Sequence, residues 1–213
     1  MNFSSKDMGN KILAAIVGVF LIGVGVAFNN CAGLGNDPVG IVYDGMRNAA
    51  GLSVEQLGMA SNAVNIFLVL LLCVIGRRYI SIGTIIYFLP YGFFVSIGER
   101  IYRMLLHTET MAVRIGFSVL GCLLLYLGVA IFIVVDIGVD PFTGIVLVIC
   151  DKVKREYRFV KVAFDISMII LGTALGGTLG VVTVATALTG GPVIQFFKSR
   201  IQWLFQVEKT ERG

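Results

Sequence analysis

Two aspartates in the same local pattern are the residues of this sequence best suited to binding chemistry. Asp37 lies in GLGNDPVG, residues 33 to 40, and Asp140 lies in DIGVDPFTG, residues 136 to 144. Each motif has the order Gly, one variable residue, Asp, Pro, and each follows a long apolar segment. A carboxylate in so hydrophobic a chain can bind a cation, carry a proton or cap a helix. The sequence leaves these three roles open.

The two motifs also predict the local backbone. Asp is a favoured N-cap because its side chain accepts the free N–H groups of the first helical turn. Pro suits the next position because its missing N–H is not needed there. We therefore expect new helices to begin at Pro38 and Pro141 and to cover about 38–49 and 141–151. Both are too short to span a bilayer, so they lie at the interface or enter the protein as half-helices.

The free N–H groups at the start of a half-helix form a natural seat for an anion. Here Asp37 and Asp140 compete for those groups, which weakens the case for an anionic ligand. A simpler alternative is that both motifs only cap a turn.

The composition requires a bilayer as the solvent for much of the chain. Of 213 residues, 57% are hydrophobic and only 14% are charged, against roughly 25% charged in soluble domains. The first apolar segment resembles a signal peptide, but it is too long and no cleavage site follows it. Segments of about 20 apolar residues, enough to cross the hydrocarbon layer, predict six spans at residues 12–31, 57–76, 79–98, 115–135, 159–176 and 180–197.

An internal repeat relates the two halves of the chain through a shift of 103 positions. Matches of Gly, Asp, Pro and Thr in one order are informative, because the alphabet of membrane segments is otherwise small. The matched positions are Gly18 with Gly121, Gly25 with Gly128, Asp37-Pro38 with Asp140-Pro141, Asn62 with Asp165 and, after a deletion of four residues, Thr84 with Thr183.

Duplicating three spans, an odd number, turns the second copy upside down in the membrane. We therefore predict an all-α membrane protein with six transmembrane helices in two inverted three-span repeats, each with a short DP half-helix after its first span. Residues 11–105 form the first repeat and 112–205 the second, within a single membrane domain, and 206–213 form a cytoplasmic tail.

The charge distribution predicts the orientation of the chain. With a cytoplasmic N-terminus, most of the 17 lysine and arginine residues lie inside, as the positive-inside rule expects. The net charge of +4 then needs no nucleic-acid partner. We expect a multi-pass protein of a bacterial plasma membrane with both termini cytoplasmic. The basic residues predicted to lie outside are Arg47, Arg100, Arg103 and Arg114.

Two further polar positions lie within predicted spans. Asp165 is either an intramembrane carboxylate or the partner of Lys161, four residues earlier on the same helix face. Its repeat mate Asn62 shares a helix face with Asn65, and such amides either serve a site or hold membrane helices together.

The third and sixth predicted spans carry threonines near their starts and helix breakers further along. Thr84 precedes Pro90, and Thr183 precedes Gly190-Gly191-Pro192. Because Pro and paired Gly bend or break helices, we expect both spans to be discontinuous in their second half. Interrupted segments at matching places in two repeats are typical of a transport site.

Other chemistries find little support in the sequence. The four cysteines are far apart and form no CxxC pair, and the only histidine, His107, is isolated. We therefore expect no metal site, no cofactor and no enzymatic activity.

The order G-x-G-x-D-P after the first span, the second G-x-D-P and a Gly-Thr…Gly-Pro pattern near the end resemble the YczE/YyaS/YitT family of bacterial integral membrane proteins. The resemblance covers roughly residues 10–200 and rests on Gly33, Gly35, Asp37 and Pro38. A Trp often follows the first DP in that family, where this chain has Val39. The resemblance implies a transporter-like protein of the bacterial inner membrane and supplies no catalytic residues.

These features lead us to expect a secondary-type transporter with alternating access, whose partners are the bilayer and a small solute coupled to protons or cations. A homodimer is compatible with so short a chain. The alternatives are a substrate-binding membrane subunit of an ATP-driven complex and an accessory membrane protein without transport. The candidate binding residues are Asp37, Asp140 and Asp165 for the ion or a cationic group, and Pro38, Pro141, Asn62, Thr84 and Thr183 for neutral contacts.

Overall fold

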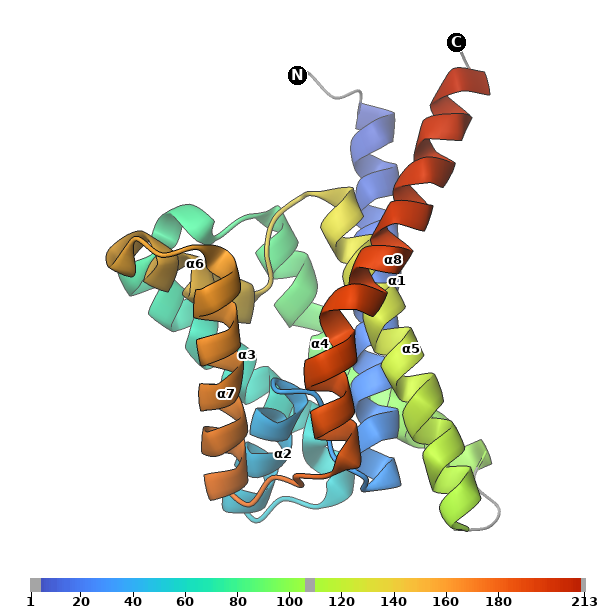
Figure 1. Ribbon diagram of the computed structural model, residues 1–213, viewed down its shortest axis with the longest axis vertical. Helices are drawn as coiled ribbons and strands as arrows, with labels where there is room; N and C mark the ends of the chain where they lie inside the picture. Colours follow the sequence, from blue (N-terminus) through green and yellow to red (C-terminus); the bar gives the residue numbers. More distant parts are fainter. Residues whose placement is uncertain (1–4, 106–109, 212–213) are drawn as a thin grey trace.

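The computed structural model describes residues 5–105 and 110–211, and all regular structure within these ranges is helical (Figure 1). This confirms the all-α prediction. His107 lies outside the described residues. The helices are α1 (Ser5–Ala32), α2 (Gly40–Ala49), η1 (Val54–Gln56), α3 (Leu57–Ile75), η2 (Arg77–Tyr79), α4 (Ile82–Leu105), α5 (Met111–Val135), α6 (Pro141–Val153), α7 (Tyr157–Ala174) and α8 (Val181–Glu211).

Five helices of the described chain are long and apolar enough to cross a membrane. They are α1, α3 with its preceding turn, α4, α5 and α8. The predicted span at 159–176 corresponds to α7, which has 18 residues and includes Arg158, Lys161 and Asp165. Because of these charges, α7 is not among the five. The predicted tail at 206–213 is the continuation of α8 as far as Glu211.

Large apolar side chains cover the outside of the helices. Phe67, Val74 and Leu188 are 63%, 84% and 73% exposed, and many other Leu, Ile and Phe residues share this exposure. Soluble monomers rarely expose apolar patches of this extent. The chain is therefore a multi-pass membrane protein whose apolar surface faces lipid.

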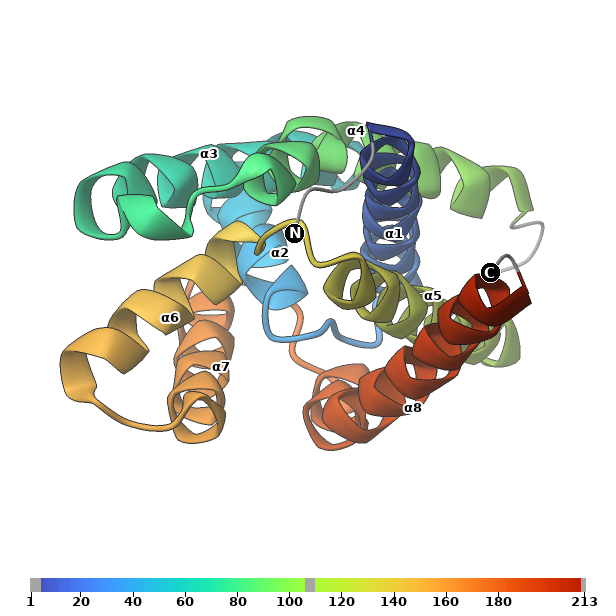
Figure 2. The ribbon, with the colours of Figure 1, turned by 90° about the horizontal axis from the view of Figure 1, so that it is seen from above.

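The helices form two groups of four, and each group takes two helices from each half of the chain. In the first group α4, α1, α5 and α8 pack side by side in that order. In the second group α2, α3, α6 and α7 form a closed ring in which each helix contacts two others. Figure 2 shows these groups next to one another, with the start of α2 between them. The packing of α3 on α4 joins the two groups.

Glycines bring α1 and α5 into close contact at the centre of the first group. A Cβ on Gly18 would lie 2.9 Å from the carbonyl oxygen of Gly128, and one on Gly25 would lie 2.5 Å from that of Gly121. The two helices run antiparallel (Figure 1). Small residues allow the two backbones to approach closely. In lipid the van der Waals packing of such close contacts, rather than the hydrophobic effect, drives the association of helices.

The predicted breaks in the third and sixth spans are wrong. Both α4 and α8 continue through Pro90 and Pro192 as single helices. A proline removes one backbone donor, but neighbouring helices can compensate in membrane proteins. In α4 the turn after Pro90 is bound by α3, where the Asn62 side chain accepts the N–H of Gly92 at 2.9 Å.

Candidate functional site

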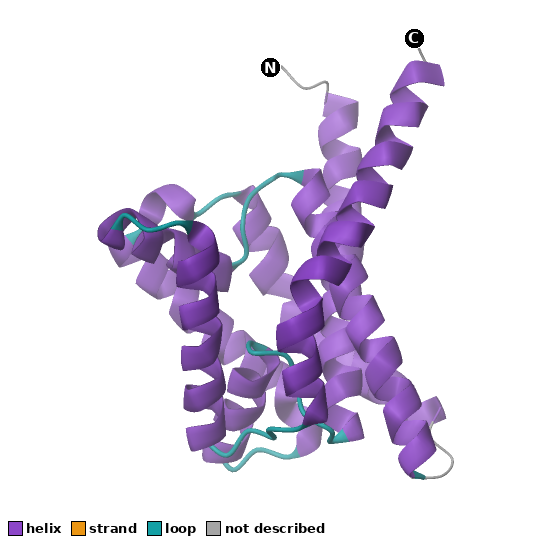
Figure 3. Ribbon diagram, viewed as in Figure 1, coloured by secondary structure: helices purple, strands orange, loops and turns teal. Residues whose placement is uncertain are grey.

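Both DP motifs lie at points where the chain turns back into the molecule. After α1 the loop rises from the end of the helix towards mid-height, and α2 then runs back to the end it came from (Figure 1). The loop after α5 descends from the opposite end in the same way before α6 begins. The loops, in teal in Figure 3, therefore bring the starts of both short helices towards the middle. Both starts therefore lie between the two ends of the long helices.

The first motif caps its helix through two hydrogen bonds. Asp37 Oδ2 accepts the backbone N–H groups of Val39 and Gly40 at 3.2 and 3.3 Å. Regular α-helix begins at Gly40 rather than at the predicted Pro38, because Pro38 and Val39 form a turn. The bond from Val42 N–H to the Val39 carbonyl, at 3.0 Å, tightens this first turn.

The second motif matches the prediction more closely. Asp140 is the N-cap of α6, with Oδ1 accepting the Thr143 N–H at 3.0 Å, and Pro141 is the first helical residue. Asp140 therefore has the capping role that was one of the alternatives for it. The observed α6 ends at Val153, two residues beyond the predicted end.

Each DP loop is hydrogen-bonded by the start of a long helix from the other half. The N–H of Val182 in α8 donates to the Leu34 carbonyl at 3.0 Å. The N–H of Gly83 in α4 donates to the Ile137 carbonyl at 3.1 Å. The two loops are thus held by helix starts that are far from them in sequence.

The predicted threonines lie at these same contacts. Thr183 Oγ1 accepts the N–H of Asn36, next to Asp37, at 3.2 Å. Thr84 Oγ1 donates to the carbonyl of Val139, next to Asp140, at 2.8 Å. The fold therefore brings Thr183 to Asp37 and Thr84 to Asp140, in two pairs that the sequence did not specify.

Close packing at the loops requires glycine at one position of each motif. Gly35 and Gly138 have φ values of +105° and +144°, which side chains with a Cβ rarely adopt. A Cβ on Gly35 would lie 2.7 Å from Thr183 Oγ1 and 2.8 Å from the backbone nitrogen of Gly180. The glycine of G-x-D-P thus lets the start of a helix from the other half approach the loop closely.

The first motif holds polar atoms that have no partner in the described part of the chain. Asn36 is fully buried, and both atoms of its side-chain amide lack a hydrogen bond. Asp37 Oδ1 is also buried and unpaired. Buried polar atoms are nearly always hydrogen-bonded in proteins, so these atoms are available to bind a polar group or an ion. Among the described residues, no side-chain oxygen of the second motif is in this condition.

Burial raises the pKa of Asp37 above its usual value, because desolvation penalises the charged form. The N–H groups of Gly40 and Val39 and the charge of Lys161 act in the opposite direction, and Asp165 adds to the increase. Lys161 and Asp165 form an ion pair on α7, which is one of the two alternatives that the sequence allowed for Asp165. Asp37 and Asp165 are therefore close enough to interact electrostatically.

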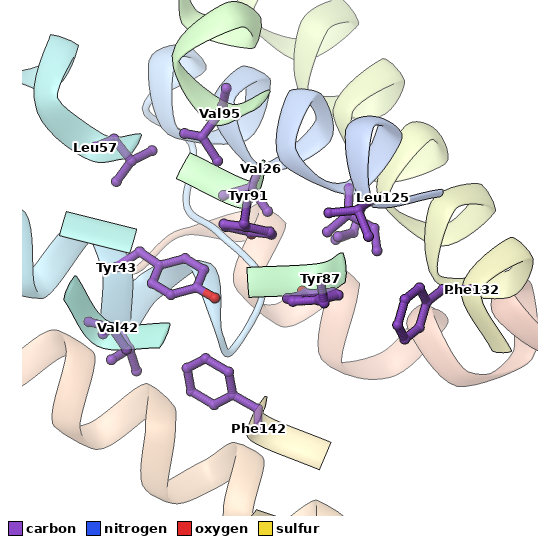
Figure 4. Packing of buried hydrophobic residues seen from close by; sticks show 14 of the residues in the cluster. Val26, Val42, Tyr43, Leu57, Tyr87, Tyr91, Val95, Leu125, Phe132 and Phe142 are labelled. Atoms are coloured by element: carbon purple, nitrogen blue, oxygen red, sulfur yellow. The ribbon is translucent and has the colours of Figure 1, made fainter. Parts of the chain in front are cut away.

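An aromatic cluster lies beside the two motifs, and Figure 4 shows its side chains. The rings of Tyr87 and Tyr91 on α4 stack at 5.2 Å, and Tyr43 on α2 lies 5.4 Å from Tyr91. Phe142, directly after Pro141, lies 5.8 Å from Tyr43. Burial raises the pKa of Tyr43 well above its usual value, and the carboxylates of Asp140 and Asp37 raise it further. The aspartates of both motifs thus interact electrostatically with Tyr43.

The two predicted amides of α3 both bind neighbouring elements. Asn62 accepts from the backbone of α4, as described above. Asn65 Oδ1 accepts the Tyr43 hydroxyl at 3.2 Å, and its buried Nδ2 has no partner within the described residues. Asn62 is therefore a packing contact, and Asn65 is the one that faces the aromatic cluster.

Sequence reasoning missed a buried ion pair on α2. Asp44, 1% exposed, pairs with Arg47 at 2.7 Å and accepts the Thr178 N–H at 2.7 Å. Burial alone would raise the pKa of Asp44, but the hydrogen bonds from Asn30, Arg47 and Thr178 outweigh it and lower the pKa. The spacing of three residues between an aspartate and an arginine on a helix was the available signal. The bond from Thr178 to Asp44 ties α2 to the loop before α8.

Comparison with known proteins supplies a family. The chain is 26% identical over 83% of its length to an uncharacterized protein of Haemophilus influenzae, covering 78% of that protein. It is 23% identical to YyaS of Bacillus subtilis over 92% of this chain and 96% of YyaS. It is 25% identical to the membrane protein YczE of the same organism over 56% of this chain and 54% of YczE.

These relatives confirm the resemblance to YczE and YyaS. No solved structure is significantly similar to the chain. The family model described as "Family of unknown function (DUF6198)" matches residues 9–199, nearly the whole helical region, and the chain belongs to this family.

Proposed function

We propose that this protein is a secondary-type transporter of a small solute, with its binding site between the two DP motifs. The observation that carries the proposal is the set of buried, unpaired polar atoms on Asn36 and Asp37. These atoms lie where a loop of one half meets a helix of the other. A site between two halves that can move relative to one another is what alternating access needs.

Exchanged contacts support two inverted repeats. Gly18 packs on Gly128 and Gly25 on Gly121, so positions aligned by the 103-residue shift exchange partners, as a two-fold axis requires. The bonds of Val182 to Leu34 and of Gly83 to Ile137 are exchanged in the same way. The short helices α2 and α6 also follow equivalent long helices.

We further propose α7 as the sixth span. Its 18 residues correspond to about 27 Å at 1.5 Å per residue, close to the thickness of the hydrocarbon layer. Its two charges furthest from the start, Lys161 and Asp165, neutralise one another as an ion pair. In Figure 1, α7 runs roughly parallel to α1.

Within this proposal the roles of the site residues follow from their surroundings. Asp37 takes up a proton or a cation at its unpaired Oδ1, and its raised pKa favours the protonated state. The Asn36 amide binds a polar group of the solute, and Tyr43 and Tyr91 provide an apolar wall. Thr84 and Thr183 hold the two loops, and their bonds across the halves are the contacts that a rocking motion changes.

We propose that the protein lies in a bacterial plasma membrane with both termini in the cytoplasm. The start of α1 and the end of α8 lie at the same end of the molecule (Figure 1), in agreement with this orientation. Single cysteines at Ser53 and Glu156 test it in intact cells. A membrane-impermeant maleimide should label Ser53→Cys from outside and Glu156→Cys only after permeabilisation. The reverse pattern would contradict the orientation.

Transport itself is tested with the purified chain in proteoliposomes. A thermal-shift screen of metabolites in detergent first selects solutes that stabilise the folded protein, because a ligand that binds only this state raises its stability. The selected solutes are then loaded with and without a pH gradient. Saturable uptake by the chain alone supports a secondary transporter. Uptake that appears only with a co-purified ATPase would assign it instead as a subunit of an ATP-driven complex.

A further inference from the structure

A cavity lies near the end of the molecule at which α1 ends, apart from the DP motifs. Its volume is about 460 Å³, within the range of about 300–1,000 Å³ that is typical of small-molecule sites. The later turns of α4 and the turn η1 line it. Its polar lining consists of Glu55, Ser96, Glu99, Arg100 and Arg103, and Phe93 adds an apolar side.

At this cavity one carboxylate and one guanidinium have no ion-pair partner among the described residues. Glu55 forms an ion pair with Arg103 across the opening. The charge of Arg103 and, after it, that of Arg47 act on Glu99, but Arg103 is paired with Glu55 and Arg47 with Asp44.

Glu99 is the carboxylate that remains, and Arg100 is the guanidinium. Glu99 is 3% exposed, and its Oε1 is buried without a hydrogen-bond partner in the described chain. Arg100 is exposed and has no ion-pair or hydrogen-bond partner within the described ranges.

The Leu57 N–H hydrogen-bonds the Glu99 carboxylate, so its unpaired oxygen is Oε1. A buried carboxylate without an ion-pair partner is costly unless a cation reaches it. Adjacent residues of a helix point about 100° apart, so Glu99 and Arg100 cannot readily neutralise one another and instead present opposite charges at different points of the same wall. A ligand that satisfies both must carry an ammonium group and an anionic group.

We propose that this cavity binds a small zwitterion, with its ammonium group on Glu99 and its carboxylate on Arg100. Free amino acids are the chemical class that has this pair of groups. Ser96 lies on the same wall as a neutral hydrogen-bonding group, and Phe93 contacts the hydrocarbon part of the ligand. The site goes beyond the proposed transport function and does not depend on it.

The test is equilibrium binding of 4-aminobutanoate to the full chain in nanodiscs. Butylamine and butanoate, which carry one charge each, show whether both charges are needed. We expect saturable binding of 4-aminobutanoate and binding at least about tenfold weaker for both analogues, as expected when a charged hydrogen bond is lost. Absence of saturable binding at millimolar concentrations for both 4-aminobutanoate and glycine would overturn the proposal.

Variants locate the site. Glu99→Gln and Arg100→Gln should each weaken binding by about tenfold or more. Glu55→Gln is the matched control, because it removes a charge of the same cavity that is already paired, and should change binding much less. Asp37→Asn should leave binding unchanged. Equal affinity of Glu99→Gln and the unmodified chain would overturn the assignment, whatever the flux assays show, and loss of binding in Asp37→Asn would move the ligand to the DP motifs.

Discussion

The two DP motifs share their backbone but differ in polarity. In both, an aspartate caps a short helix, a glycine with positive φ precedes it, and a helix of the other half binds the loop. In the first motif, however, buried polar atoms of Asn36 and Asp37 lack partners. The second motif has Val139 at the position of Asn36, and its threonine contact satisfies the backbone there.

This difference distinguishes the residues that build the turn from those that are available to bind a ligand. The features common to both motifs are those that build a tight turn between a long helix and a short one, and they explain why the chain contains G-x-D-P twice. The unpaired atoms of Asn36 and Asp37, found only in the first motif, make no hydrogen bond within the described chain, which costs roughly 1–3 kcal/mol each if nothing else binds them. We infer that the first motif carries the binding chemistry and the second is its structural counterpart.

The largest expected effect concerns the glycines that both motifs share. Gly35→Ala adds strain at positive φ and pushes a methyl group against the backbone of Gly180, so we expect a loss of about 2–4 kcal/mol. Gly138→Ala should cost less, because its Cβ meets mainly the Ser81 side chain and the nearest backbone atom, Gly83 Cα, is 3.3 Å away. Thermal unfolding in detergent measures both.

Gly51→Ala is the control for these two changes. Gly51 has a φ of +65°, and the space that an added methyl group would occupy is open. Its substitution therefore reports backbone strain alone, at about 1 kcal/mol. If Gly35→Ala were no worse than Gly51→Ala, the close approach of α8 to the first loop would not matter for stability.

An intermediate effect is expected at the two threonines. Thr183→Val leaves the buried Asn36 N–H without its acceptor, which should cost about 1–3 kcal/mol. Thr84→Val removes a donor from the Val139 carbonyl and an acceptor from the Ser81 N–H, and because both contacts are only part-buried it should cost about 1 kcal/mol. Unfolding of the single and double variants gives both values and their coupling. A larger loss of stability in Thr84→Val than in Thr183→Val would contradict this order.

The smallest effect on stability is expected at the aspartates, and it should depend on pH. Asn keeps the caps in Asp37→Asn and Asp140→Asn. Burial raises the pKa of folded Asp37, so the unmodified protein loses stability as pH rises from about 4, the usual carboxyl range, through the raised folded pKa. Asp37→Asn lacks this loss and should become more stable than the parent as pH rises.

Asp140→Asn is the matched control for the pH experiment. Its carboxylate accepts one hydrogen bond from Thr143, which an asparagine oxygen can replace. We therefore expect its melting temperature at neutral pH to stay close to that of the parent. The same pH-dependent gain in both variants would remove the distinction between the motifs.

Much of the fold is predictable from the sequence, because membrane helices and caps are local. The apolar segments give the long helices, and Asp140-Pro141 gives the start of α6 to the residue. The breaks expected at Pro90 and Pro192 fail, since the outcome for a proline depends on the neighbouring helix and not on the proline alone. At α4 that neighbour is Asn62, 30 positions from Gly92.

The site is less predictable, because burial depends on distant parts of the chain. Asn36 looks like an ordinary loop residue until Thr183, 147 positions away, packs over it. Its one sequence signal is the mismatch with Val139 between the two repeats. Glu99 was missed for a similar reason, since its burial comes from the packing of the folded chain and no motif surrounds it.

The most direct test of the central claim is solute flux in proteoliposomes containing the unmodified chain, Asp37→Asn or Asp140→Asn, with the solutes selected by thermal shift. We predict saturable flux of at least one solute by the unmodified chain, a loss of about tenfold or more in Asp37→Asn, and a much smaller loss in Asp140→Asn. No flux of any solute by the unmodified chain would contradict the transport function. Equal losses in the two variants would contradict the assignment of the binding chemistry to the first motif.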